Sequence, residues 1–199
     1  MACALAPILL CAGEYHWDLP KGFPQPRVPA SNPMSEAKVR LGRYLFYDKR
    51  LSLNGTQSCA SCHRQELAFT DGRAAALGAT GEPHPRGAMS LVNVAYAATL
   101  TWSNPDLRSL EKQALIPMLG EHPVELGLAG REAAVLVTLR AEPVYRGLFP
   151  QSFPETAEPF NLANAANAIA AFERTIISAR SPYDRYYRGG DKSDRKSVV

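Results

Sequence analysis

The amino-acid sequence predicts a mainly α-helical fold in which long loops connect short helices. Several segments place apolar residues at helical spacing behind a capping residue. No segment shows the alternating pattern of a half-buried strand above noise. Between the helical segments lie stretches rich in glycine and proline, which are typical of extended chain and loops.

The predicted elements can be placed in chain order. Residues 14–34 hold five prolines and are expected to form an extended arm. Residues 70–87 are rich in glycine and proline and predict a long loop, which is uncommon in a compact domain unless it is functional. Helices are expected from the Ser35 cap to about Tyr47, over 109–119 with an interruption at Pro117, over 131–140, from Pro143 onward and, most clearly, over 161–178.

Length and composition allow one domain with extensions. Residues 1–13 are apolar and could be the remnant of an export signal, although no Lys or Arg precedes Lys21. Residues 35–188 are expected to form the domain, and 189–199 a polar tail or the point where a longer chain is cut. A net charge of +3, without a basic run, argues against nucleic acid, and no stretch is apolar enough to span a bilayer.

Cys59-Ala60-Ser61-Cys62-His63 is the strongest functional signal in the chain. Two thiols three positions apart can each bond one vinyl group of a single porphyrin, and the adjacent histidine can bind the iron on the proximal side. The sequence therefore predicts a covalently attached haem c and a cytochrome c-like domain around it.

Two other uses of this pattern compete with haem attachment. A structural zinc site needs two more ligands, and the remaining histidines have no paired spacing. A thioredoxin-like dithiol follows a strand, whereas residues 53–58 have the composition of a turn. The remaining histidines are His16, His84 and His122.

The sixth position of the iron separates two functions. An electron carrier closes it with Met or His, and Met89 or His84 could do so. A peroxidase leaves it open and needs a group that moves a proton between the peroxide oxygens, for which Glu125 in its apolar context is the candidate. Spacing alone favours a packing or surface role for each candidate, and a chain that never loads haem is a third possibility. The remaining candidates are Gln113 and Pro117 on one helical face and Trp102 as an electron carrier.

Several motifs, in order, resemble the N-terminal haem domain of bacterial di-haem cytochrome c peroxidases and of MauG. The resemblance covers about residues 33–190. It is specific, because it includes more than the haem motif. The motifs are Leu-Gly-Arg-Tyr-Leu-Phe-Tyr-Asp at 41–48, Ala-Phe-Thr-Asp-Gly at 68–72, Leu-Val-Asn-Val-Ala-Tyr at 91–96, Leu-Glu-Lys-Gln-Ala at 110–114, Pro-Val-Glu-Leu-Gly at 123–127 and Ala-Phe-Glu-Arg-Thr at 171–175.

The resemblance implies roles for the candidate residues. Trp102 would lie between two haems, while Gln113, Pro117 and Glu125 would line the distal pocket, with Glu125 as the acid–base group. Family members that need reductive activation carry a histidine in the loop after the motif. This chain has Ala79 there, which implies an iron without a histidine lid, as in MauG-type enzymes.

Residues 16–24 and 120–127 look closest to the MauG-like branch that includes MbnH, which implies oxidation of a tryptophan on a partner protein. The family has a second haem domain with its own attachment motif, and only one such motif is present here. The chain is therefore expected to be the N-terminal half of the architecture, as a fragment or a truncated product, with the second haem in the C-terminal domain. Gly87 replaces an asparagine of the family's calcium site, which puts calcium in doubt.

These expectations combine into one functional prediction. The chain is expected to belong to a haem c-dependent oxidoreductase that uses hydrogen peroxide and exchanges electrons with a partner protein or a donor cytochrome. A mono-haem electron-transfer cytochrome is the alternative. A periplasmic location is expected because bacteria attach c-type haem outside the cytoplasmic membrane.

Overall fold

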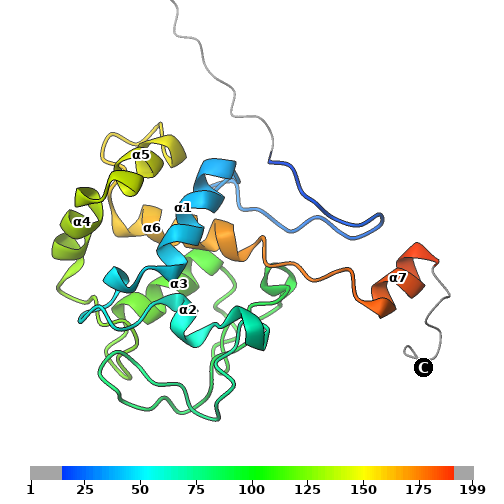
Figure 1. Ribbon diagram of the computed structural model, residues 1–199, viewed down its shortest axis with the longest axis horizontal. Coiled ribbons are helices and arrows are strands. Elements are labelled where there is room, and N and C mark those ends of the chain that lie inside the picture. The colour runs from blue at the N-terminus through cyan, green and yellow to red at the C-terminus, as the bar shows by residue number, and fades with distance from the viewer. Residues whose placement is uncertain (1–14, 191–199) are drawn as a thin grey trace, which may run out of the picture.

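Helices and the loops between them make up residues 15–190, the part of the chain that the computed structural model describes (Figure 1). Within this range no β-strand forms, and strand-type pairing is limited to isolated bridges. The mainly α-helical prediction is therefore confirmed. The predicted export signal at 1–13 and residues 191–199 of the predicted tail lie outside the described residues. The α-helices are α1 (Glu36–Tyr47), α2 (Cys59–Cys62), α3 (Leu110–Leu119), α4 (Glu132–Ala141), α5 (Pro143–Ser152), α6 (Leu162–Glu173) and α7 (Pro182–Gly189).

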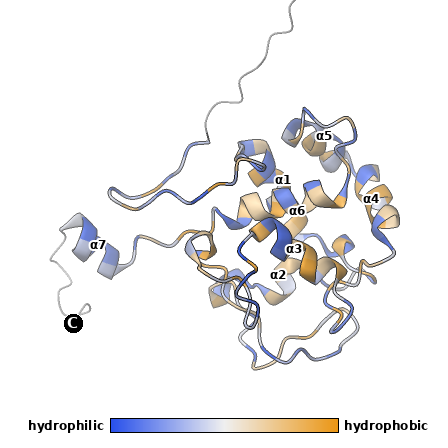
Figure 2. Cartoon of the chain, turned by 180° about the vertical axis from the view of Figure 1, so that it is seen from behind, coloured by the Kyte–Doolittle hydropathy of each residue, from blue (hydrophilic) through white to orange (hydrophobic). Residues whose placement is uncertain are grey.

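The core forms where α1 crosses α6, with α5 against α1 and α3 against α6 (Figures 1 and 2). Helix α1 buries Leu41, Leu45 and Phe46 completely. The facing side of α6 is rich in alanine, and the two backbones come so close at Gly42 that a Cβ atom there would lie 1.9 Å from the carbonyl oxygen of Ala168. Small residues at a helix crossing thus set how the two longest helices pack.

The predicted helix starts are confirmed, because the expected caps form. The Oγ of Ser35 accepts a hydrogen bond from the N–H of Lys38 at 3.2 Å. Ser109 caps α3 and Asn161 caps α6 in the same way, and α5 begins with Pro143. A side-chain acceptor at the N-cap satisfies N–H groups that have no partner within the helix.

Two of the predicted helices have different ends. Helix α6 stops at Glu173 instead of continuing to 178, because the N–H of Thr175 turns back to the carbonyl of Phe172 at 2.9 Å. Beyond the helix, the side-chain amide of Asn93 binds the backbone of Ser178. Its Nδ2 donates to the carbonyl of Ser178, and its Oδ1 accepts from the N–H of Ser178. Helix α3 is not interrupted at Pro117 but continues for two further residues.

Two helices that the sequence analysis did not predict also form. The haem motif itself folds as α2, and α7 begins with a capping box in which Ser181 and Asp184 bond each other's backbone. Helix α7 lies off to one side of the body (Figure 1), where the guanidinium of Arg188 stacks over the ring of Phe23 at 4.9 Å. The N-terminal arm and α7 therefore support each other.

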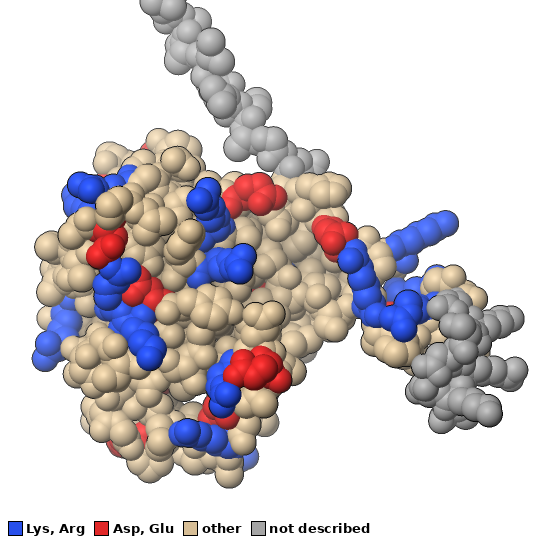
Figure 3. Space-filling view, viewed as in Figure 1, with Lys and Arg blue, Asp and Glu red and all other residues tan. Residues whose placement is uncertain are grey.

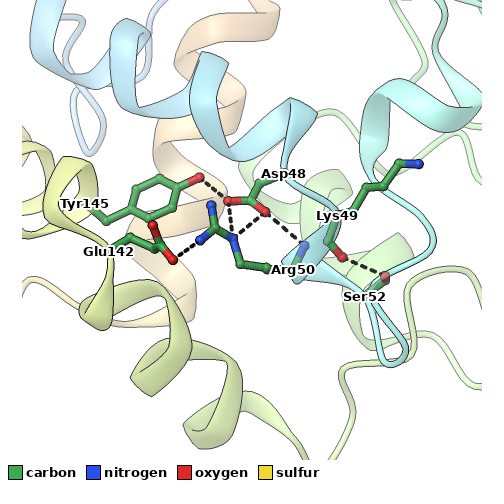
Figure 4. A network of polar contacts seen from close by, with 6 residues as sticks. All are labelled: Asp48, Lys49, Arg50, Ser52, Glu142 and Tyr145. Atoms are coloured by element: carbon green, nitrogen blue, oxygen red, sulfur yellow. Dashed lines mark hydrogen bonds and ion pairs between the residues drawn. The ribbon is translucent and has the colours of Figure 1, made fainter.

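A buried polar network joins the end of α1 to the start of α5 (Figure 4). Asp48 accepts hydrogen bonds from the hydroxyl of Tyr145 at 2.6 Å and from the guanidinium of Arg50 at 2.9 Å, and Arg50 also pairs with Glu142. Burial alone would raise the pKa of Asp48, but these hydrogen bonds outweigh it and hold the pKa below its usual value. The network fixes the turn that leads toward the haem motif.

The surface carries charges of both signs. Basic and acidic side chains lie next to one another on the face that Figure 3 shows, in line with the small net charge of +3. Among the described residues, no helix has both the length and the apolar character needed to cross a membrane.

We predict that Gly42→Ala destabilises the fold by about 2–3 kcal/mol, because the added methyl group would collide with the backbone of α6 at Ala168. Urea unfolding followed by circular dichroism measures the effect. Gly147→Ala in α5 is the control. Its added methyl group would meet only the end of the Gln151 side chain at 3.7 Å, so we expect a stabilisation of about 0.5–1 kcal/mol. Equal effects of the two substitutions would show that the crossing tolerates a wider separation of α1 and α6.

Candidate haem pocket

A cavity of about 340 Å³ opens beside α2, enclosed by the loop after the haem motif and by α3 and α6. Its walls are partly apolar and include Leu91, Val94 and Ile169. The residues that the sequence analysis named for haem attachment, for the distal pocket, for electron transfer and as candidate sixth ligands all line this one cavity. These residues are Cys59, Cys62, His63, Trp102, Gln113, Pro117 and Glu125, together with the two candidate sixth ligands His84 and Met89.

Helix α2 presents both cysteines to the cavity. Residues three apart on a helix share a face, which places Cys59 and Cys62 side by side. The N–H of Ser58 donates to the Oγ of Ser61 at 3.0 Å and so fixes the start of this short helix. Both cysteines are free thiols, and burial raises the pKa of each. The pair is therefore uncharged and available to form two thioether bonds to one porphyrin.

The ring of His63 is oriented by the loop that follows. Ala68 and Phe69 both adopt the left-handed backbone conformation, and the carbonyl of Phe69 lies 2.9 Å from Nδ1 of His63. A carbonyl only accepts hydrogen bonds, so Nδ1 must carry the hydrogen and Nε2 keeps its lone pair. Burial lowers the pKa of His63, and backbone contacts with Phe69 and Met89 act in the opposite direction. The result is a neutral imidazole whose Nε2 can bind iron.

Backbone hydrogen bonds hold Glu125 in place from both sides. Its carbonyl accepts from the N–H of Ala79 at 2.7 Å, and the N–H of Leu126 donates to the carbonyl of Pro117 at 2.8 Å. The loop passes so close that a Cβ at Gly78 would lie 1.8 Å from the carbonyl oxygen of Val124. The segment that carries Glu125 is thus pinned between the end of α3 and the loop after the haem motif.

The carboxylate of Glu125 faces the imidazole of His84. Its Oε1 lies 3.9 Å from Nδ1 of His84. Burial raises the pKa of Glu125, and His84 partly offsets this increase. Raised carboxyl pKa values are typical of groups that both accept and return a proton.

Trp102 lies at the edge of the cavity with 59% of its surface exposed. Its indole N–H donates to the carbonyl of Gly87 at 2.9 Å, and the guanidinium of Arg86 lies 5.5 Å from the ring centre. A Cβ at Gly87 would lie 2.0 Å from the carbonyl oxygen of Arg73, so no larger residue fits there without a backbone shift. The indole is therefore fixed in orientation although it is open to solvent.

Glu173 is a cavity residue to which the sequence analysis gave no role. It ends α6, is 5% exposed, and its Oε2 has no hydrogen-bond partner within the described residues. Burial raises its pKa to about 8, and the neighbouring Arg174 only partly offsets this. Arg174 itself pairs with Glu111 at 2.6 Å. The available signal was a lone acid at the end of a helix that is otherwise small and apolar.

The residues present fit a haem c. Two thiols on one helical face, a histidine with a free Nε2 and a partly apolar cavity are what attachment requires. The alternatives find less support. Across residues 15–190, no three His, Cys, Asp or Glu side chains gather into a metal site, and in that same part of the chain no strand precedes α2 as a dithiol site would require.

A family model described as di-haem cytochrome c peroxidase matches residues 36–192. This chain belongs to that family. The expected resemblance is thereby confirmed, and membership implies a haem c cofactor. The shared motifs run from α1 to the end of α7, which is nearly the whole described part of the chain.

Individual relatives support the same assignment. MauG of Methylorubrum extorquens is 33% identical to this chain, and the match covers 92% of this chain and 50% of MauG. The cytochrome c551 peroxidase of Pseudomonas aeruginosa is 32% identical over 81% of the chain and 45% of its own length. The chain therefore spans about half the length of the curated relatives it matches.

A solved structure shows the same arrangement. A MauG-like protein associated with microbial copper homeostasis superimposes with a TM-score of 0.86 and 50% identity, covering 89% of this chain and 51% of that one. This match confirms both the N-terminal haem-domain architecture and the predicted likeness to the MauG-like branch.

We predict that the stability of the chain falls as the pH rises from about 4.5 to about 8, and that Glu173→Gln removes this dependence. The folded state holds the Glu173 proton up to a pKa of about 8, whereas the unfolded chain releases it near 4.5, so deprotonation favours unfolding in that window. The variant should gain stability over wild type with increasing pH, by at most about 5 kcal/mol above pH 8.

Urea unfolding of the haem-loaded chain at pH 5 and pH 9 measures this difference. Glu82→Gln, which alters an exposed carboxylate, should leave it unchanged. A wild-type stability that stays constant or increases over this range would show that Glu173 is ionised in the folded chain.

Proposed function

We propose that this chain is the haem-binding N-terminal half of an oxidoreductase that uses hydrogen peroxide. Cys59 and Cys62 hold the porphyrin through two thioether bonds, and Nε2 of His63 binds the iron. The bound haem supplies the redox chemistry that no side chain of the chain can supply. What the polypeptide contributes is attachment, orientation and proton transfer.

The geometry of Glu125 is the observation that carries this proposal. Its carboxylate enters the cavity from the loop after α3, is held by backbone bonds on both sides, and has a raised pKa. Cleavage of peroxide needs one group that removes a proton from one oxygen and returns it to the other. Glu125 is suited to both steps, and the side-chain amide of Gln113 can hydrogen-bond the peroxide while the proton moves.

The loop after the motif favours an open iron. Where reductively activated relatives carry a histidine, this chain has Ala79, whose buried methyl group cannot bind a metal. Pro117 adds a rigid apolar surface to the same wall. We infer that peroxide reaches the iron without a prior ligand change, as in the MauG-type members.

Trp102 is proposed to carry electrons between this haem and a second one in the C-terminal half. An indole fixed at the cavity edge and half open to solvent is placed where a second domain or a partner protein can contact it. The partner is a redox protein, either a donor cytochrome or a protein substrate. We place the protein in the periplasm because haem c is attached there in bacteria.

A calcium site forms no part of the proposal. At the position of the family's asparagine ligand, Gly87 offers only its carbonyl, and that oxygen already accepts from the indole of Trp102.

A mono-haem electron-transfer cytochrome is the second candidate, because His84 and Met89 both line the cavity. It requires one of them to leave its present contacts and bind the iron opposite His63. The pairing of His84 with Glu125 acts against that change for His84.

Absorption and electron paramagnetic resonance spectra of the ferric haem-loaded chain, before and after one equivalent of hydrogen peroxide, test the proposal. A high-spin ferric signal that peroxide converts to a more oxidised state, from which a reductant recovers two electrons per peroxide, is the expected result. A low-spin signal that does not respond to peroxide would overturn it and leave the electron-transfer cytochrome.

We predict that Glu125→Gln slows the reaction of the ferric chain with peroxide by roughly 10²–10⁴-fold, because the amide cannot accept the proton. Stopped-flow absorption at increasing peroxide concentration gives the second-order rate constant. Glu121→Gln changes an exposed carboxylate four residues earlier and serves as the matched control. If Glu125→Gln reacts as fast as the control, another group handles the proton.

A further inference from the structure

His84 is the titratable residue that pairs with Glu125 in the cavity, and in the peroxide-using function proposed above it binds neither iron nor peroxide. The two side chains lie on different segments, with Nδ1 of His84 3.9 Å from Oε1 of Glu125. His84 has a side chain that is only 12% exposed, whereas that of Glu125 is 41% exposed. The pair forms part of the cavity wall, with His84 the more buried of the two.

Backbone bonds hold this pair together. The N–H of His84 donates to the carbonyl of Ala76 at 2.8 Å, and Gly78 donates to Glu82 at 3.0 Å, which closes residues 76–84 into a small hairpin. The N–H of Ala79 at the tip of this hairpin donates to the carbonyl of Glu125. The position of His84 beside the carboxylate thus follows from the fold of the loop and does not depend on the attraction between the two side chains.

The surroundings of Glu125 make His84 influential. Burial disfavours the ionised carboxylate, and among the described residues His84 is the group that acts against this effect. The other titratable groups of the cavity are Cys59, Cys62, His63, Arg86 and Glu173. Of these, the two thiols and Glu173 can only be neutral or negative, and the guanidinium of Arg86 lies over the ring of Trp102 at 5.5 Å.

We propose that His84 is a positioning residue for proton transfer, whose imidazole, placed beside the carboxylate by the fold of the loop, stabilises the form of Glu125 that accepts a proton. The inference rests on the proposed function, because it deepens the role of Glu125. His84 does not contact peroxide or iron in this proposal. It acts only through the carboxylate, and without it Glu125 stays protonated to higher pH and loses its ability to act as a base.

Cyanide binding to the ferric haem-loaded chain tests the proposal without relying on peroxidase activity. Hydrogen cyanide is the main form below its own high pKa, and it must lose its proton to bind ferric iron, so a base in the cavity accelerates binding. The association rate is measured from pH 5 to pH 9 in wild type, His84→Gln, Glu125→Gln and the double variant. His16→Gln, which changes an exposed histidine on the N-terminal arm, is the control.

In His84→Gln we expect the pH at which binding accelerates to move upward and the rate near pH 6 to fall by roughly 2- to 100-fold, the range of coupling between contacting residues. At high pH the rates should converge with wild type. In the Glu125→Gln background the same His84 substitution should change nothing, because the group through which it acts is absent. His84→Lys, which supplies a positive charge at this position, should retain a profile close to wild type.

Three results would overturn the proposal. An unchanged pH profile in His84→Gln would show that His84 does not act on Glu125, and equal effects of that substitution with and without Glu125 would show that it acts independently. A change from a low-spin to a high-spin ferric spectrum on substitution would identify His84 as an iron ligand instead. If His84→Gln fails to load haem, His84→Ala carries the same comparison.

Failure of the proposed function has a different signature. In that case neither wild type nor Glu125→Gln binds cyanide, because the iron is closed. Suppose instead that cyanide binding to wild type accelerates with pH, that the His84 variants behave like wild type, and that Glu125→Gln does not. The proposed function then stands, and the proposed role of His84 is wrong.

Discussion

The close crossing of α1 and α6 is the constraint on which the rest of the structure depends. It brings Phe46 of α1 against Phe172 of α6, with ring centres 5.2 Å apart, and Phe46 also lies 6.4 Å from the ring of His63. One apolar contact thus links the helix crossing to the candidate iron ligand. Helix α6 ends with Glu173 in the cavity and supports α3, which carries Gln113 and Pro117. A wider crossing would shift the proximal histidine and the opposite wall at the same time.

Much of the fold could be predicted from the sequence, because its signals are local. The caps Ser35, Ser109 and Asn161 and the first-turn Pro143 each act within one helical turn, so their residue types are sufficient to place a helix start. The end of α6 could not be predicted in this way. It depends on Asn93, which lies 85 residues from the Ser178 backbone that it binds, and no local pattern reveals such a partner. The capping box that starts α7 was a local signal and could have been used.

The candidate site divides in the same way. The haem motif was visible because its three residues are neighbours in the sequence. The remaining pocket residues were candidates from their local context, and the family resemblance then implied their roles. Glu173 and the partnership of His84 with Glu125 were not visible, because their meaning depends on burial and on contacts across the fold. The sequence alone does not show how far the pKa of a carboxyl group is shifted, because the shift depends on the surroundings in the fold. Only the folded chain shows that Glu173 is enclosed without a hydrogen-bond partner for one oxygen in the described structure, whereas Glu125 faces an imidazole.

This contrast between the two carboxylates has a physical consequence for the cavity. Both are disfavoured as anions by burial, but only Glu125 lies next to a basic group inside the cavity wall, while the neighbour of Glu173, Arg174, is already paired with Glu111. The neutral form of Glu173, which burial favours, adds no negative charge near Cys59, whereas the imidazole of His84 acts to favour the ionised form of Glu125. Two carboxyl groups in one cavity thus differ in how strongly their neighbours favour the anion, because His84 faces Glu125 while the guanidinium next to Glu173 is engaged by Glu111.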